Sequence, residues 1–449
     1  MNPVVLIPTY VSASGRPEPG PTTATYDHTT ALSARGELPR CLESLRVVRG
    51  LGQILILVVA EPAIENQAAS KVRAIVEQFA DLRISVVGAP EEVLVRQRLE
   101  QQNISVRNEI GLAGYGAARN FGLLLAGALD FDAAVFVDDD EVIDDPAFLE
   151  KAMYGLGKLT RRGVPILAKT GFYLNANGDY RSSRSTKWYN RHWDQATAFN
   201  KWITAAMKGP RLSRSNHVCG GCIALHREAF RRVAFDPWIS RGEDLDYMLN
   251  LRMYGSDIWF DNTWYMHHLP PATKREGLRF RQDIFRWLYE FRKIEYARTQ
   301  IDLMQIKPQS LQPYPGPFLE PGITKRIKRT ALMRSLGRPD GKGYRRAAKS
   351  ATGEASYYAE EHCANYFGFQ AMWPAIMQRM SDDKMLQGVL LRQVPNQQIA
   401  PNGAQAGQMG QASQPGSGQP SAQRSMWGSA GGINPGATTE IRLNMPQGE

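Results

Sequence analysis

Three consecutive carboxylates, Asp138–Asp140, follow an apolar and β-branched stretch of the chain. The stretch predicts a buried parallel strand, Ala133–Val137, that ends at the acidic cluster. Because side chains alternate along an extended chain, we expect Asp138 and Asp140 on one face and Asp139 on the other. Carboxylates this close repel each other unless a cation lies near them, and ligands of open α/β sheets bind at this end of the strands. The cluster therefore indicates a cation site or, alternatively, an acidic loop that simply faces water.

A second acidic pair, Glu243-Asp244, opens a helix that we predict over Asp244–Tyr254. Acids in a first helical turn stabilise the helix dipole and accept hydrogen bonds from free N–H groups, which is the ordinary interpretation of such a pair. An Asp within hydrogen-bond reach of a substrate hydroxyl can also remove its proton as a general base. The pair alone is compatible with both interpretations.

The elements that would position these acids alternate between strand and helix from Met1 to about Pro271. The predicted strands are Val4–Ile7, Ile54–Val59, Ile84–Val87, Ala133–Val137, Ile166–Lys169, Cys222–His226 and Ile258–Trp264. The predicted helices are Glu37–Arg49, Ala68–Phe79, Gly116–Leu129 and Asp244–Tyr254. Such alternation predicts an α/β fold with a Rossmann-like, mostly parallel sheet flanked by helices.

Composition divides the chain into three regions. Residues 1–272 form the predicted α/β domain. Residues 273–393 are expected to be a helical, basic region, with long amphipathic candidates at Leu278–Gln300 and Ser356–Met380. Residues 394–449 are rich in Gly, Gln, Ser, Pro and Ala and have almost no apolar periodicity, so we predict a disordered tail.

Most of the net charge of +10 comes from residues 323–350, which hold ten Lys or Arg and a single acid, Asp340. Such a segment is typical of a solvated helical face, and it could also contact an anionic membrane. We expect no nucleic-acid partner. Four cysteines are too few for a disulfide framework, and no apolar run is long enough to span a bilayer. The expected location is therefore the cytoplasm, with peripheral contact at the inner face of the membrane as a further expectation.

Several short motifs follow one another in a particular order. They are Pro8-Thr9-Tyr10 at the end of the first strand, Gly114-Tyr-Gly-Ala-Ala-Arg-Asn120 at a helix start, Asp138–Asp140, Cys219-Gly-Gly-Cys222, and Arg241-Gly-Glu-Asp-Leu-Asp246. In this order the chain resembles the family-2 glycosyltransferases with the GT-A fold, over about residues 1–271. The resemblance implies a metal-dependent transfer of a sugar from a nucleotide-diphosphate donor to a hydroxyl acceptor, in glycan, polysaccharide or cell-envelope synthesis.

The resemblance also implies roles for particular residues. Asp244 would be the catalytic base, and Glu243 would help to bind donor or acceptor. Asp138, Asp140 and a late histidine, His267, would hold Mn²⁺ or Mg²⁺. The residues that would contact the UDP- or GDP-sugar are Pro8, Thr9, Tyr10, Glu61, Gly114, Arg119, Asp138 and Asp139. Glu61 is the acid nearest to a position where the family usually has Asp.

Several alternatives stay open. His267 and His268 are adjacent and face opposite ways in an extended chain, so at most one is expected to ligate the metal. Asp244 as a base favours an inverting hexosyltransferase, although relatives with a metal-binding histidine include retaining enzymes. The acceptor could be a glycan, a lipid-linked molecule or a small hydroxyl compound. Other candidate functions are a nucleotidyltransferase and a sugar-nucleotide-binding protein without transferase activity. His217, Cys219, Cys222 and His226 could also form a zinc site.

Overall fold

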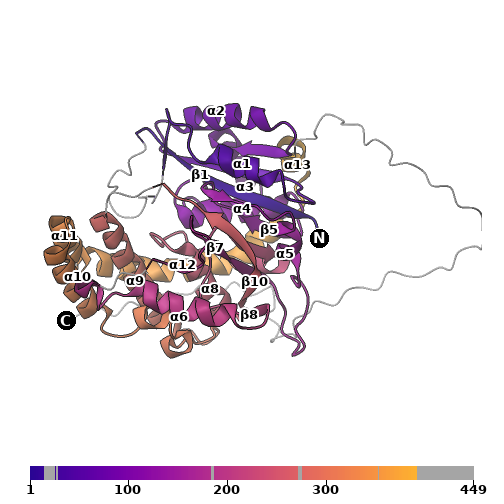
Figure 1. The fold of residues 1–449 in the computed structure, drawn as a ribbon. Helices are drawn as coiled ribbons and strands as arrows, with labels where there is room; N and C mark the ends of the chain where they lie inside the picture. The colour runs from indigo at the N-terminus through magenta and orange to yellow at the C-terminus, as the bar shows by residue number, and fades with distance from the viewer. Residues whose placement is uncertain (15–25, 27–28, 184–186, 272–275, 352, 392–449) are drawn as a thin grey trace, which may run out of the picture. The chain divides into compact units, whose positions relative to one another are not determined.

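The computed structural model describes residues 1–14, 26, 29–183, 187–271, 276–351 and 353–391 (Figure 1). Contacts divide the chain into two units, Met1–Asn396 and Gln397–Glu449. The second unit, and with it the predicted disordered tail at residues 394–449, lies outside the described residues.

The core of the first unit is a mixed sheet with ten strands in the described residues. Its order is β4 (Ile84–Val87), β3 (Ile54–Ala60), β1 (Pro3–Ser12), β5 (Ala133–Phe136), β9 (Ile223–His226), β7 (Ala168–Leu174), β10 (Ile258–His268) and β6 (Glu141–Val142). The short strands β2 (Thr30–Ala31) and β8 (Leu212–Arg214) pair with β1 and β10. Strands β4, β3, β1 and β5 are parallel, whereas β9 runs antiparallel to both of its neighbours. The predicted α/β class is confirmed.

The strand order reverses between β1 and β5. The chain runs from β1 outward through β3 to β4, and then returns to the other side of β1 with β5. Ligands of open α/β sheets bind in the crevice that such a reversal leaves at the carboxyl ends of the strands. The two segments that reach this crevice are Tyr10, near the end of β1, and Asp138–Asp140, just after β5.

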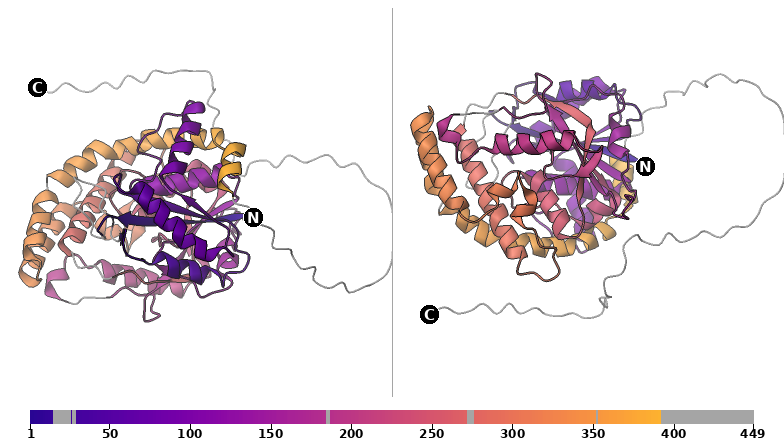
Figure 2. Two further views of the ribbon diagram at one scale, coloured as in Figure 1. Left: turned by 90° about the horizontal axis from the view of Figure 1, so that it is seen from above. Right: turned by 60° about the horizontal axis from the view of Figure 1, so that its bottom comes forward.

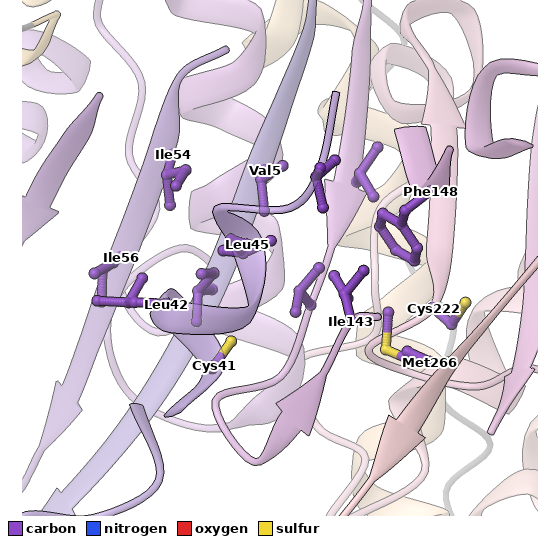
Figure 3. Packing of buried hydrophobic residues seen from close by; sticks show 14 of the residues in the cluster. Val5, Cys41, Leu42, Leu45, Ile54, Ile56, Ile143, Phe148, Cys222 and Met266 are labelled. Carbon is purple, nitrogen blue, oxygen red and sulfur yellow. The ribbon is translucent and has the colours of Figure 1, made fainter. Parts of the chain in front are cut away.

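Helices cover both faces of the parallel half of the sheet. On one face, Leu42 and Leu45 of α1 (Leu38–Leu45) belong to a buried cluster with Val5, Ile54 and Ile56 of the strands (Figure 3). Helices α2 (Glu65–Val76) and α5 (Phe148–Met153) add to the same cluster. On the other face, α4 (Tyr115–Ala128) packs against β1, β3 and β5. The remaining helices before residue 272 are α3 (Ala89–Gln101), α6 (Gln195–Met207), α7 (Arg227–Arg232) and α8 (Glu243–Met253).

The helical region after residue 272 packs on the sheet region within the same compact unit (Figures 1 and 2). It comprises α9 (Glu276–Ala297), α10 (Ile323–Gly337), α11 (Gly341–Ala351), α12 (Glu354–Arg379) and α13 (Lys384–Leu390). Helix α12 packs along α9 and also contacts α4 and α7. The described residues on either side of the predicted boundary at 272–273 thus belong to one compact unit. Among the described helices, none combines the length and the apolar character needed to cross a bilayer.

A buried ion cluster fixes α9 on α8. The ammonium of Lys293 lies 2.6 Å from Asp236 and 2.9 Å from Asp246, and all three side chains are fully buried. Removing one member of such a cluster leaves an uncompensated buried charge, which costs about 3–5 kcal/mol. The position of α9 beside α8 is therefore strongly held, and this matters because α9 contributes to the site described next.

Candidate active site

A cleft with a volume of about 230 Å³ lies at the reversal point of the sheet. Its lining brings together eight of the predicted residues: Pro8, Tyr10, Arg119, Asp138, Asp139, Asp140, Glu243 and Asp244. These residues come from β1, α4, the loop after β5 and the start of α8. The residues that the motifs single out therefore converge on one cavity, although they span 237 positions of the sequence.

The acidic cluster forms a turn rather than the continuation of a strand. Strand β5 ends at Phe136, and the N–H of Asp138 donates to Glu141 Oε2 at 3.0 Å. We expected Asp139 to face away from Asp138 and Asp140, but all three Asp residues line the cleft. The Asp139 carboxylate also accepts a hydrogen bond from Thr9 Oγ1. Burial and the adjacent carboxylates raise the pKa of Asp139 to about 8, and burial raises that of Asp138 to about 6.

Glu141 is a fourth acid beside this cluster, and the sequence analysis did not identify it. Its side chain is fully buried, and burial together with Asp138 and Asp140 raises its pKa well above the usual range. The carboxylate occupies the space above Gly221, where a Cβ would lie 2.2 Å from Glu141 Oε2. Only glycine allows the loop of the Cys219-Gly-Gly-Cys222 motif to approach so closely.

The two late histidines lie in different surroundings, as expected of adjacent residues in a strand. His267 lies 3.0 Å from Asp144 and is not in the cleft lining of the described residues. His268 lines the cleft, with its Nε2 3.4 Å from Asp140 Oδ2 and its ring stacked on Tyr173 at 4.8 Å. His268 therefore replaces His267 as the candidate metal ligand.

The residues of the cleft fit a cation that is shared with a substrate. The described residues contain no group of three His, Cys, Asp or Glu that could hold a metal by themselves. Asp140 and His268 form a close pair, and Asp138 lines the same cleft. Mg²⁺ is commonly held by one or two carboxylates together with substrate phosphates, and imidazole is an acceptable ligand for Mn²⁺.

Arg119 connects three parts of the cleft lining through hydrogen bonds. Its guanidinium donates to Glu243 Oε1 at 2.8 Å, to the carbonyl of Gly220 at 3.0 Å and to Asp138 Oδ1 at 3.3 Å. The residue is only 3% exposed, and Glu243 is 6% exposed. Arg119 thus connects the start of α8, the Gly220 loop and the acidic loop, and both Arg119 and Glu243 line the cleft in which donor or acceptor contacts are predicted for them.

Asp244 stands at the start of α8, and α9 supplies two arginines beside it. Asp244 Oδ1 accepts the N–H of Leu245 at 2.7 Å, which orients the carboxylate. Gly242 precedes it with φ +75°, and the guanidinium of Arg286 fills the place where a Cβ would lie. Arg279 and Arg286 both line the cleft. The sequence analysis missed both, because an Arg of an amphipathic helix looks the same whether it faces water or a cavity.

The aromatic end of the cleft includes Tyr10 and Tyr115, with ring centroids 5.2 Å apart. Tyr26 packs on Tyr10 at 4.5 Å, and its hydroxyl accepts the N–H of Gly114 at 2.7 Å. Three predicted donor contacts, Thr9, Glu61 and Gly114, are not in the cleft lining of the described part of the chain. Instead, Thr9 donates a hydrogen bond to Asp139, and the N–H of Gly114 donates one to the hydroxyl of Tyr26. Glu61 lies just after the end of β3.

The alternative zinc site is not formed. His217 packs against the rings of Phe199, Trp202 and Tyr314, whereas His226 caps α7 by accepting the N–H of Glu228. All four described cysteines are buried free thiols. The spacing of His217, Cys219, Cys222 and His226 therefore reflects the loop and β9, and these four residues do not form a metal-holding group in the described part of the chain.

No family model matches the chain, and no curated protein does. Among solved structures, it is similar to a mannosyltransferase from Pyrobaculum calidifontis in complex with GDP-Man and Mn²⁺, at 14% identity over 86% of each chain with a TM-score of 0.40. It is also similar to GalNAc-T7 with UDP, GalNAc and Mn²⁺, at 12% identity over 69% of this chain and 53% of that chain, TM-score 0.37. A third is TarS of S. aureus, at 13% identity over 78% and 55% of the two chains, TM-score 0.31. At such TM-scores the geometry of the cleft, rather than the likeness, supports a function.

Proposed function

We propose that this chain is a metal-dependent glycosyltransferase, which moves a hexose from a UDP- or GDP-sugar to a hydroxyl group of an acceptor. The observation that supports this most strongly is that the required groups line one cleft. Two carboxylates and an imidazole, from Asp138, Asp140 and His268, face the same space as an oriented Asp and two arginines. Transfer of a sugar from a nucleotide diphosphate requires groups that bind a cation, groups that carry positive charge, and a base.

The first group of residues would bind the donor. Asp138, Asp140 and His268 would hold Mn²⁺ or Mg²⁺, which when bound neutralises charge on the departing diphosphate. Arg279 and Arg286 add fixed positive charge to the same cleft. The rings of Tyr10 and Tyr115 offer flat faces for the nucleobase.

The second group would act on the acceptor. Asp244 is the candidate base, since its carboxylate lines the cleft and is held by the Leu245 N–H. It would take the proton from the acceptor hydroxyl as that oxygen attacks the anomeric carbon, with inversion. The Arg119–Glu243 ion pair fixes the first turn of α8, which contains Asp244.

The proposal is tested by incubating the full chain with a panel of UDP- and GDP-hexoses, Mn²⁺ and hydroxyl acceptors. A glycosyltransferase releases nucleoside diphosphate, and Asp244→Asn should keep donor binding while losing transfer. A nucleotidyltransferase would instead move the nucleoside monophosphate to the acceptor hydroxyl and release sugar 1-phosphate, and a binding protein would release neither product. Either of these results would contradict the proposal.

We also propose that α10 and α11 contact an anionic membrane surface. Seven basic side chains of these helices are exposed: Lys325, Lys328, Arg329, Lys342, Arg345, Arg346 and Lys349. Three others pack over rings, namely Arg326 on Phe318, Arg334 on Phe280 and Arg338 on Tyr189. The exposed Leu332 and Leu336 of α10 accompany the exposed bases. Such a combination suits peripheral binding to anionic lipid.

A further inference from the structure

Two cavities continue the cleft along α6. A cavity of about 410 Å³ shares Tyr173 and His268 with the candidate active site. A second cavity, of about 840 Å³, shares Asn175, Asp179 and Arg181 with the first. Because they share these residues, the three cavities are neighbours in a row that starts at His268. We call the part beyond His268 the α6 groove; its walls are residues 175–183 and α6 with Lys208.

One wall of the α6 groove is a polar stripe on a helix. Thr197, Lys201, Thr204 and Lys208 follow one another at spacings of three or four residues, so they lie on one face of the helix, and all four line the outer cavity. The apolar side of the same helix is buried through Trp202 and Ile203. The groove-facing stripe is therefore built of hydroxyl and ammonium groups, which bind polar ligands.

The other wall is held in place by its own hydrogen bonds. Ser182 and Asn200 exchange two of them, with the Ser182 N–H donating to Asn200 Oδ1 and Asn200 Nδ2 donating to the Ser182 carbonyl, both at 2.9 Å. Asp179, the one acid in the lining of the outer cavity, lies 3.0 Å from Arg181. Because this pair is neutral, Lys201 and Lys208 leave the groove with net positive charge.

The inner cavity adds aromatic faces to this polar lining. Tyr180, Phe199 and Tyr314 contribute rings there, together with the amide of Gln195. Aromatic faces beside a few placed polar groups are the usual lining for a sugar ring. A lipid tail would require an apolar wall, which the stripe on α6 does not offer.

We infer that the α6 groove binds an extended acceptor glycan that bears carboxylate, sulfate or phosphate groups. The inference rests on the proposed function, since the groove begins where Asp244 and the donor would meet. The sugar next to the cleft contacts the rings of the inner cavity. Units farther along the chain bind the hydroxyls and amides of the outer cavity, and their anionic groups pair with Lys201 and Lys208.

The test measures oligosaccharide binding to the full chain by calorimetry. The probes are hyaluronan, chondroitin sulfate and phosphomannan oligosaccharides of increasing length, with neutral cello-oligosaccharides of equal lengths. Lys201→Gln/Lys208→Gln removes the charge, Thr204→Trp fills the groove, and Arg161→Gln/Arg162→Gln is a control with the same loss of charge at two exposed residues before β7. Binding of UDP and GDP with Mn²⁺ is measured on every variant.

The expected result is tighter binding of at least one anionic series as its chains lengthen. Loss of the two lysines should weaken it about tenfold, as the loss of one or two charge-assisted hydrogen bonds implies. Thr204→Trp should also weaken it, whereas the Arg161→Gln/Arg162→Gln control should bind the anionic series unchanged, and nucleotide binding should be the same in all variants. If nucleotide binds, two results overturn the inference and leave the proposed function standing. In the first, anionic chains bind no better than neutral ones. In the second, they bind the variant without Lys201 and Lys208 as tightly as the control variant. If nucleotide does not bind the unaltered chain, the proposed function is overturned, whatever the result with the anionic chains.

Discussion

The guanidinium of Arg119 lies 2.8 Å from Glu243, and this contact joins α4 to the first turn of α8. The same guanidinium reaches Asp138 at 3.3 Å and the carbonyl of Gly220 at 3.0 Å. One buried cation therefore sets the distance between the acidic loop that would bind the donor and the helix that carries Asp244. The Arg119–Glu243 contact makes the two halves of the cleft a single structural unit.

Replacing Arg119 should affect folding and catalysis to different degrees. Arg119→Ala leaves Glu243 and Asp138 without their partner, and we expect a loss of about 3–5 kcal/mol in the free energy of unfolding. Arg119→Lys keeps the charge but cannot make three directed contacts, so it should retain most stability and lose activity. Denaturant unfolding and kcat on the two variants separate these effects. Full activity in Arg119→Lys would show that the positioning is unimportant.

The two histidines give a matched pair for the metal site. His268→Ala should weaken Mn²⁺ binding about tenfold or more, as the loss of an orienting or ligating imidazole does in metal sites. His267→Ala should leave it unchanged, because His267 contacts Asp144 instead of the cleft. Mn²⁺ titration in the presence of UDP, followed by electron paramagnetic resonance, measures both. Equal effects of the two substitutions would contradict the assignment.

His217 predicts a pH dependence of stability. Desolvation, with a smaller effect of Arg286, lowers its pKa from 6.5 to about 3, and its ring packs against Phe199 and Tyr314. Between these values the unfolded chain holds a proton that the folded chain does not, so stability falls as the pH drops below 6.5. The contribution is at most about 1.4 kcal/mol per pH unit.

His217→Phe should remove this part of the pH dependence. Unfolding free energies of both chains between pH 4 and 7 provide the measurement, and the difference between them should grow as the solution becomes more acidic. A constant difference would mean that His217 takes up its proton equally readily in the folded and unfolded chains, which would contradict the lowered pKa.

The sequence predicts well those features that depend on local pattern, and less well those that depend on packing. Six of the seven predicted strands coincide with β1, β3, β4, β5, β9 and β10, because each contains a distinct apolar run. The predicted strand Ile166–Lys169 overlaps β7 only at Ala168 and Lys169, since β7 continues to Leu174. The surroundings of His267 and His268 could not be read from the sequence, because they depend on how β10 packs on β6 and β7, which places His267 beside Asp144 and His268 beside Asp140 and Tyr173. Arg286 could not be identified, since its role depends on how α9 docks through Lys293.

The exposed bases of α10 and α11 predict salt-sensitive binding to vesicles that contain phosphatidylserine. Each Lys or Arg at such a surface contributes about 1 kcal/mol. Replacing Lys325, Lys328 and Arg329 by Gln should therefore reduce sedimentation with these vesicles strongly. The same loss of charge at the exposed Arg83, Arg161 and Arg162 should not. Equal sedimentation with neutral vesicles would rule out this surface as an anionic-lipid contact.

The central claim is that the acidic loop binds a metal and a nucleotide sugar for transfer. It is tested most directly by the release of nucleoside diphosphate from UDP- and GDP-hexoses with Mn²⁺, with and without EDTA, for the unaltered chain, Asp140→Asn and Asp144→Asn. Asp140 lines the cleft, whereas Asp144 contacts His267 outside it. We predict release that EDTA abolishes, that Asp140→Asn loses and that Asp144→Asn keeps. Release that persists in EDTA, or that both variants retain, would contradict the claim.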